Sequence, residues 1–256
     1  MNETNSSLVV HVESWLIIPD LHYPFHDQAF VSLTEKLVKR IKPTGIVQLG
    51  DALDFFQISA YDKNPARTND VFDDLQLYND QLSRWCRYMP KGSRFYQLEG
   101  NHEDRLRRFI WRQAAELKQM VKSVPDVLNF KERNNSGHVE FKWFPMANWR
   151  ACRIGDVYLH HGYIFSKHVA VSCLDRYHAN LITGHTHRFQ FASNGVNWAA
   201  TLGHGSNENQ TAHSPAPTHW VQCLAVLTVD QGKKSHLEPI FIKDGSCVFR
   251  GELVQA

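Results

Sequence analysis

The chain has 256 residues, 43% of them apolar, which is enough to bury a sizeable core in one domain or two. Its formal net charge of +2 argues against a protein that coats nucleic acid generally. Its five cysteines include no Cys-x-x-Cys pair, which argues against a zinc knuckle or a disulfide framework and predicts free thiols in a reducing cytosol.

The amino-terminal segment predicts neither a signal peptide nor a membrane span. Residues 1–7 are polar and lack basic side chains, and the stretch 8–18 is interrupted by His11 and Glu13. We find no internal repeat and no linker that would divide the chain. The sequence therefore predicts a single domain over residues 1–256 in a soluble, cytoplasmic protein.

The first predicted strand, residues 15–18, is apolar and ends in Pro-Asp20-Leu-His22. Side chains two residues apart share a face of an extended chain, and open α/β sheets place their sites at the carboxyl ends of strands. Asp20 and His22 are therefore candidate ligands. The alternative for Asp20 is to cap the following helix, but Asp27 is the better cap because apolar residues recur at helical spacing over residues 30–41.

The second predicted strand, residues 46–49, is followed by Gly-Asp51-Ala-Leu-Asp54. A strand, helix, strand order implies a parallel crossover, which brings Asp51 beside Asp20. Two unpaired carboxylates at one sheet edge repel each other and favour a cation between them. We expect Asp54 in the first turn of a helix.

The third predicted strand, residues 95–98, leads into Gly-Asn101-His102-Glu. The amide oxygen of Asn101 is a hard ligand, and His102 on the same turn can face a substrate. Before this strand we expect a polar loop over residues 59–70 and then a helix. One face of that helix is apolar and carries Val71, Leu75, Tyr78, Leu82 and Trp85.

A helix is predicted over residues 104–122. Arg105, Arg108 and Arg112 share one of its faces. Arg105 either holds a phosphate through a bidentate fork or is solvated, whereas a solvated face is the better interpretation of the other two. A separate apolar stripe comprises Leu106, Phe109, Ile110, Leu117, Met120 and Val121.

After a connecting loop with a short helix at residues 123–137, polar and apolar residues begin to alternate, which predicts a second and more antiparallel sheet. The alternating segments are residues 139–144, 149–154 and 157–159. The last of them ends in His160-His161-Gly, again a histidine at a strand end. Alternation turns the two histidines to opposite sides, so only one of them can face the site.

A helix at residues 170–177 precedes the run Leu-Ile-Thr-Gly184-His185-Thr-His187. We expect the glycine to let the backbone turn sharply and both histidines to point the same way. Two imidazoles from one strand end make a pair of metal ligands, and the alternative is two ordinary loop histidines.

The rest of the chain predicts a hairpin over residues 188–202 around an Asn-Gly turn. The polar segment 204–219 predicts a long loop, either a lid over the site or a surface connection. Further strands are expected at residues 221–229 and 237–242.

Five short polar motifs follow one another along the chain: Asp-x-His, Gly-Asp-x-x-Asp, Gly-Asn-His-Glu, His-Gly and Gly-His-Thr-His. Together they resemble the calcineurin-like metallophosphoesterase family over about two thirds of the chain, Asp20 to His187. The run Asp-x-His-x-Pro-x-His-Asp, with Gly-Asn-His-Glu-x-Arg-Leu, is also similar to a compact, phage-type branch described as exonuclease-like.

The resemblance implies a dinuclear site. Asp20, His22 and His187 would hold the first metal, and Asp51 would bridge both. The second metal would be held by Asn101, His161 and His185, since the family's histidine precedes a glycine. His102 would be the general acid, and Asp54 would orient it. The mixture of carboxylate, imidazole and amide suits Mn, Fe, Zn or Ni better than Mg or Ca, and we expect Mn.

The implied fold is a four-layer α/β/β/α sandwich of two mixed sheets, with the site at the carboxyl edge. The implied reaction is attack of a metal-bridging hydroxide on a phosphate ester. Three functions remain: a phosphodiesterase acting on nucleic acid or nucleotides, a phosphomonoesterase, and a metal-dependent scaffold. The basic helix at Arg105 and the aromatic segment Tyr78, Trp85 and Tyr88 favour the first, and the paired His102 and Asp54 argue against the last.

Overall fold

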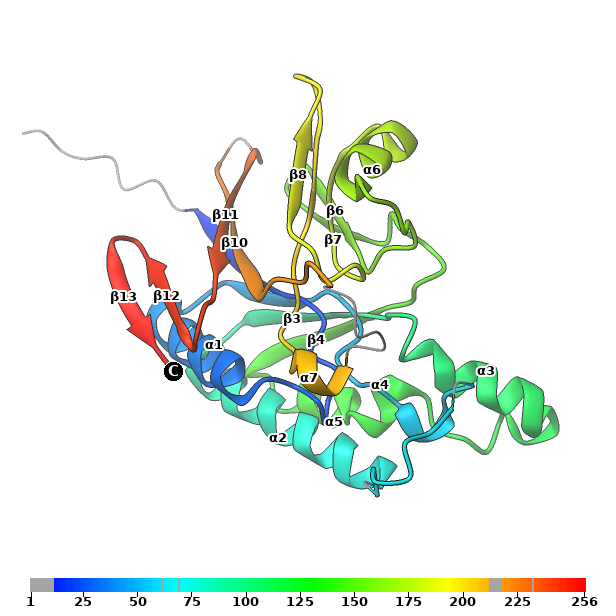
Figure 1. Cartoon of the computed structure of the whole chain (residues 1–256). Helices are drawn as coiled ribbons and strands as arrows, with labels where there is room; N and C mark the ends of the chain where they lie inside the picture. The colour runs from blue at the N-terminus through cyan, green and yellow to red at the C-terminus, as the bar shows by residue number, and fades with distance from the viewer. Residues whose placement is uncertain (1–11, 61, 69, 212–217, 232) are drawn as a thin grey trace, which may run out of the picture.

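The computed structural model describes residues 12–60, 62–68, 70–211, 218–231 and 233–256. In this part of the chain two mixed β-sheets face each other, and helices cover their outer faces (Figure 1). The predicted α/β fold with two mixed sheets is therefore confirmed. The prediction for residues 1–7 lies outside the described residues.

The first sheet has six strands in the order β11-β10-β1-β2-β3-β4. The strands β1 to β4 run parallel, and β10 and β11 continue the sheet antiparallel from β1. The bounds are β1 (Glu13–Ile18), β2 (Gly45–Gln48), β3 (Ser93–Leu98), β4 (Val139–Phe144), β10 (Cys223–Val229) and β11 (Ser235–Phe241).

The helices α1 (Gln28–Ile41) and α2 (Val71–Tyr88) run beneath this sheet (Figure 1). As predicted, Asp27 caps α1 by accepting a hydrogen bond from the Phe30 backbone N–H at 2.8 Å, an interaction that contributes about 1 kcal/mol. Apolar residues at helical spacing bury one face of each helix, among them Leu33 and Leu37 of α1 and Leu82 of α2.

The second sheet has five strands in the order β5-β6-β7-β9-β8. Its outer face is covered by α6 (Val169–Tyr177), which contacts β7, β8 and β9. The bounds are β5 (Cys152–Ile154), β6 (Val157–His160), β7 (Asn180–Thr183), β8 (Gln190–Ser193) and β9 (Trp198–Thr201). A separate hairpin, β12 (Ser246–Phe249) and β13 (Glu252–Gln255), ends the chain.

Alternation along the strands separates the core into layers. In β1, Leu16 and Ile18 pack toward the helices, whereas Trp15 and Ile17 pack between the two sheets. All four are at most 1% exposed, and each buried side chain contributes about 1.5–3 kcal/mol. A third cluster joins α6 to the second sheet. These layers hold the strand ends, and thus the site, in place.

The structure corrects the assignment of residues 139–144, which we predicted in the second sheet. β4 instead extends the first sheet, parallel to β3, with Phe144 paired to Leu98. Its alternation reflects one buried face on an edge strand, and that pattern does not reveal which neighbour the strand joins.

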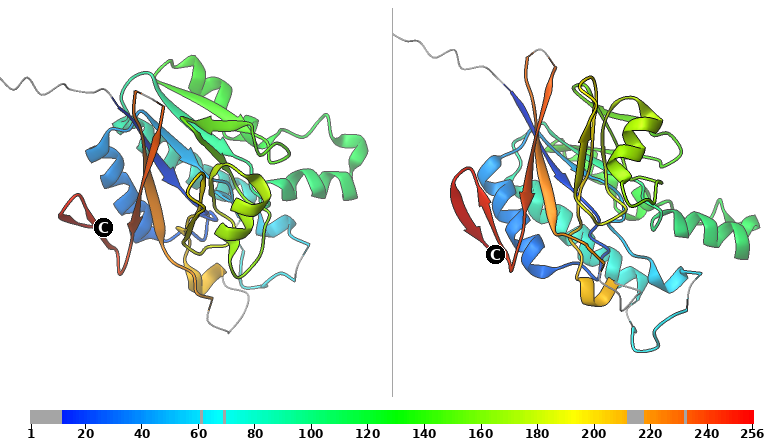
Figure 2. Two further views of the ribbon diagram at one scale, coloured as in Figure 1. Left: turned by 90° about the horizontal axis from the view of Figure 1, so that it is seen from above. Right: turned by 45° about the horizontal axis from the view of Figure 1, so that its top comes forward.

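The predicted helix at residues 104–122 is also too long. α3 (Asp104–Gln113) is followed by a short 3₁₀ turn, η2 (Ala115–Leu117), and the segment projects from the body (Figure 2). Leu117 and Met120 are 49% and 81% exposed, so the second half of the apolar stripe lacks the packing that would sustain a helix.

Short helices occupy several predicted loops. They are η1 (Phe56–Ile58), α4 (Val124–Val127), α5 (Phe130–Asn135) and α7 (Glu208–Thr211). Asp54 precedes η1 in the chain and does not lie in a helix. α7 lies within the predicted loop 204–219, of which residues 212–217 are outside the described residues. All five cysteines are free thiols, as predicted. Among the described residues, the helices lack the combination of length and apolar character that a bilayer crossing requires.

Candidate metal centre

The polar motifs converge in one region because the order of the strands in the two sheets brings their ends together. β1, β2 and β3 are parallel neighbours, so the residues that follow them, Asp20, Asp51 and Asn101, reach one edge of the first sheet. In the second sheet β6 and β7 are also parallel neighbours. They deliver His161 and the pair His185 and His187 to the same region.

The first group of donors consists of Asp20, His22 and His187, whose ligand atoms all lie within 4.8 Å of one another. Asp20 Oδ2 is 3.1 Å from His187 Nε2. The Nε2 atoms of His22 and His187 also face each other at 3.1 Å. All three side chains are buried.

The second group consists of Asp51, His161 and His185, again within 4.8 Å. Asp51 Oδ2 is 3.1 Å from His161 Nε2, and the same nitrogen is 2.9 Å from Asn101 Oδ1. Because Asp51 Oδ2 also lies 4.0 Å from His22 Nε2, this carboxylate stands between the two groups.

The donor set fits divalent transition metals. Two imidazole nitrogens that face each other at 3.1 Å present lone pairs to the same space. Asp20 Oδ1 and His187 Nδ1 are buried and have no hydrogen-bond partner among the described residues. Imidazole and carboxylate donors without competing partners are the environment that Mn, Fe, Zn or Ni would use.

The carboxylates and imidazoles shift each other's protonation. Burial raises the pKa of Asp51, but the nearby His161 and His102 overcome this effect and hold it well below the usual value. Burial lowers the pKa of His161, yet Asp51 raises it to about 10. The site therefore contains charged groups in a buried setting, where a cation would replace the protons.

His102 lies beside the second group and is held by Asp54. Its Nδ1 is 3.0 Å from the Asp54 backbone carbonyl and 3.2 Å from Asp54 Oδ2. Its Nε2 lies 3.8 Å from Asp51 Oδ2 and thus faces the donors. The roles of His102 as the acid and of Asp54 as its orienting carboxylate stay predictions, with which this geometry is compatible. Asp54 Oδ2 is also 3.1 Å from His22 Nδ1, so one carboxylate fixes two imidazoles.

Arg105 contacts both Asp54 and His102. Its Nη1 donates to the Asp54 backbone oxygen at 2.7 Å, and its Nη2 is 3.0 Å from His102 Nε2. A solvated helix face is therefore the wrong interpretation of this side chain. The guanidinium lies against His102 itself, and its role toward a phosphate remains a prediction.

The structure separates the two adjacent histidines. His161 lies between Asp51 and Asn101, whereas His160 packs among Trp149 and Tyr177 on the other side of the strand. Burial lowers the pKa of His160 to about 3, so it is a neutral core residue.

Gly184 is required for a different reason from the one we predicted. A Cβ at this position would collide with Asp20 Oδ1, so the glycine permits a close approach of two loops. The left-handed conformation falls instead on His185 (φ 73°) and His187 (φ 58°). The alternation argument therefore does not apply here, and the two histidines join different groups.

Sequence reasoning missed two supporting residues. Glu103 is 1% exposed, and its carboxylate accepts backbone N–H bonds from Asp51, Leu53 and Gly100 at 2.8–3.0 Å. Glu103 thereby links the second polar motif, Gly-Asp-x-x-Asp, to the third, Gly-Asn-His-Glu. His204 is buried and stacks on His187 with ring centroids 5.0 Å apart. The glutamate is part of the Gly-Asn-His-Glu run, but His204 had no sequence signal beyond its residue type.

Two sheets bring groups of carboxylate and imidazole donors to one edge, beside a histidine held by an aspartate, and these donors could hold metal ions. A family model described as calcineurin-like phosphoesterase matches residues 15–230. The chain belongs to this family, and it is a hydrolase that acts on phosphate esters.

Several solved structures are similar to this chain at low sequence identity. Vacuolar Protein Sorting 29 from Cryptosporidium parvum is 16% identical with a TM-score of 0.51, covering 96% of this chain and 97% of that chain. Vps29 complexed with Zn²⁺ from Entamoeba histolytica is 15% identical with a TM-score of 0.48, covering 94% and 98%. Yfce, a phosphoesterase from E. coli, is 14% identical with a TM-score of 0.43, covering 94% and 98%. No curated protein sequence matches the chain.

Proposed function

We propose that this protein hydrolyses phosphodiester bonds of nucleic acid or nucleotides with two divalent transition metals, Mn before Fe, Zn or Ni. The observation that carries the diester preference is the basic start of α3, where four arginines lie between residues 105 and 112 and the first contacts His102. The aromatic segment no longer supports it, because Tyr78 and Trp85 are fully buried. The five free thiols support a cytosolic location.

The metals would occupy the two donor groups. Asp20, His22 and His187 would hold the first, and Asp51 would be shared. The second would be held by His161, His185 and Asn101. When bound, such ions stabilise the charge that develops on phosphoryl oxygens and lower the pKa of water.

The chain's own residues account for departure of the leaving group. With Nδ1 fixed by Asp54, His102 directs Nε2 toward the donors, where it can give a proton to the leaving oxygen. Arg105 would exchange its contact with His102 Nε2 for a phosphate oxygen when substrate enters.

The test compares bis-p-nitrophenyl phosphate with p-nitrophenyl phosphate in the presence of Mn²⁺. We expect a higher kcat/KM on the diester. A higher value on the monoester would overturn the diester proposal and favour a phosphomonoesterase. Asp51→Asn serves as the control for contaminating phosphatase, because it removes the carboxylate that both donor groups share.

A further inference from the structure

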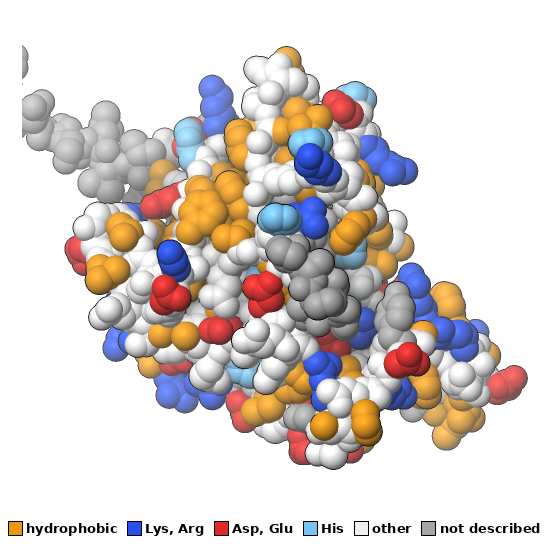
Figure 3. Space-filling model, viewed as in Figure 1, with side chains coloured by type: hydrophobic (Ala, Val, Ile, Leu, Met, Phe, Trp, Pro, Cys, Tyr) orange, Lys and Arg blue, Asp and Glu red, His pale blue; other side chains and the backbone are white. Residues whose placement is uncertain are grey.

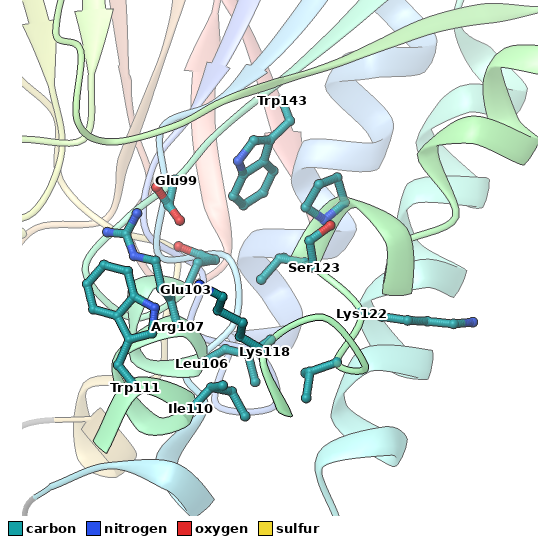
Figure 4. A pocket seen from close by; sticks show the side chains of 13 residues that line it. Glu99, Glu103, Leu106, Arg107, Ile110, Trp111, Lys118, Lys122, Ser123 and Trp143 are labelled. Atoms are coloured by element: carbon teal, nitrogen blue, oxygen red, sulfur yellow. The ribbon is translucent and has the colours of Figure 1, made fainter. Parts of the chain in front are cut away.

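A pocket with a volume of about 420 Å³ lies against α3 and is separate from the candidate metal centre (Figure 4). It is enclosed by the end of β3, by α3, by the segment 118–123, by the start of α4 and by β4. This volume lies in the range of small-molecule sites. None of the proposed metal ligands, His102 or Arg105 lines it.

The body of the pocket suits a flat, apolar group. The Trp143 indole enters it from β4, and Trp111 of α3 lies across the space (Figure 4). Leu106 and Ile110 form its apolar floor. Trp111 is 60% exposed, so it marks an open mouth where a planar ligand could stack.

One end of the pocket is polar and mixed in charge. Glu99, Glu103, Arg107 and Lys118 gather there (Figure 4). Glu103 already accepts three backbone N–H bonds, which leaves it little capacity for a ligand. Glu99 is 8% exposed, and its Oε2 accepts a hydrogen bond from the Met146 backbone N–H at 2.8 Å. This acceptor lines the same end of the pocket as Lys118 and as Arg107, whose guanidinium also pairs with Asp104.

A carboxylate acceptor and a cation at one end of the pocket match the hydrogen-bonding edge of guanine better than that of adenine. Guanine presents two neighbouring N–H donors and a carbonyl acceptor on one edge, which match a carboxylate next to a cation. Adenine offers an amino group beside a ring nitrogen acceptor and no carbonyl. Lys122 points away from the cavity (Figure 4), but Lys and Arg side chains gather on the lobe that α3 forms (Figure 3). A phosphate attached to the base would lie among positive charges.

We propose that this pocket binds the guanine base of a nucleotide, with Glu99 and Lys118 reading its edge and Trp111 stacking on its face. The proposal rests on the proposed function, since it specifies which nucleotide a phosphodiesterase of this kind would bind outside its metal centre. The guanine belongs either to a free nucleotide or to a unit of a strand, and the experiment separates these sources.

The experiment titrates the full-length, Mn-loaded protein with dGMP and with dAMP by calorimetry. Any phosphate binding at the metals is the same for both nucleotides, so the ratio of their Kd values reports on the base. We expect dGMP to bind at least tenfold more tightly. Glu99→Gln should abolish that preference, and Trp111→Ala should weaken dGMP roughly 5- to 100-fold, the range measured for loss of one stacked base or one bidentate contact.

Matched controls come from the same chain. Glu140→Gln changes an exposed glutamate of β4 outside the pocket, and Phe191→Ala removes an aromatic side chain that is 55% exposed on β8. Neither should change the dGMP to dAMP ratio. A preference that survives Glu99→Gln would overturn the guanine site, and so would a ratio near one in the parent protein together with no preference among the oligonucleotides of the second arm.

A second arm uses single-stranded oligonucleotides with and without one dG. Tight binding of free dGMP identifies a free nucleotide, whereas a Glu99-dependent preference seen only with the oligonucleotides identifies a strand. No preference in either form overturns the proposal. Hydrolysis of bis-p-nitrophenyl phosphate is measured in parallel. Guanine binding without diester hydrolysis would refute the proposed function alone, and hydrolysis without guanine preference would refute this site alone.

Discussion

Asp54→Asn and Arg105→Gln should move the pH profile of the enzyme in opposite directions. His102 acts as an acid only when it is protonated. Burial lowers its pKa, but Asp51 and Asp54 raise it above the usual value, and Arg105 acts to lower it. Loss of the Asp54 charge should therefore lower the pKa of His102, and loss of the Arg105 charge should raise it.

The magnitude follows from the contacts. Two unit charges 3.2 Å apart, the separation of Asp54 Oδ2 and His102 Nδ1, interact by about 5 kcal/mol at an effective dielectric constant of about 20. Asp54 also faces His22 at 3.1 Å and Arg105 at 3.3 Å, so His102 receives only part of this energy. We expect a pKa change of about one to two units, or roughly 1.4–2.7 kcal/mol.

The assay measures kcat/KM against pH for diesters with poor and good leaving groups. Activity on the poor leaving group should fall as pH rises through the pKa of His102. This descending limb should lie at lower pH in Asp54→Asn and at higher pH in Arg105→Gln. A p-nitrophenolate leaving group departs without a proton, so its rate should change much less. Metal content is measured in both variants, because Asp54 also contacts His22.

Two results would refute the reasoning. If both variants move the limb the same way, the charges do not act through His102. If both lose activity equally on good and poor leaving groups while retaining their metals, His102 stabilises charge in the transition state and does not donate a proton.

The remaining predictions concern the metals and the loops that hold them. Asp51→Asn should lose both metals together in elemental analysis, and a variant that keeps full occupancy would contradict the shared carboxylate. Chelation should lower the Tm, and metal restored at a hundredfold excess over Kd should recover about 5 °C or more per site; an unchanged Tm would argue against metal binding. Gly184→Ala should destabilise the fold by about 1–3 kcal/mol in urea unfolding, because its methyl group meets Asp20, and an unaltered midpoint would show that the loops yield. His161→Phe should lose a metal, whereas His160→Phe should keep metals and stability, since neither ring nitrogen of His160 has a partner among the described residues.

The convergence of donors could be predicted from the sequence because it depends on strand order. Asp20, Asp51 and Asn101 each follow an apolar run, and helices between those runs impose parallel strands. Parallel neighbours must end at one edge, so no long-range information is needed. The choice of His161 needed the family's histidine-glycine order, since strand alternation only separates it from His160.

Long-range contacts are the part that local patterns could not show. β4 alternates like a strand of a second sheet, yet its partner is β3. Tyr78 and Trp85 suggested a stacking surface, but helical spacing places them in the core, which is the outcome their apolar stripe already favoured. Arg105 also contacts Asp54, a residue 51 positions away in sequence, and periodicity cannot predict that contact.

We expect Glu103 to keep the proposed metal centre and the proposed guanine pocket energetically independent, although both lie beside α3. Its carboxylate binds the backbone N–H groups of Asp51, Leu53 and Gly100, so the loops that carry the donors are fixed by a group that lies between the two sites. A ligand in the pocket would meet Glu99, Trp111 and Glu103, and three backbone N–H groups already hold the Glu103 carboxylate. The loops that carry the proposed metal ligands would keep the position in which Glu103 holds them. Guanine binding should therefore leave metal affinity unchanged, and by reciprocity metal loading should leave the dGMP to dAMP ratio unchanged.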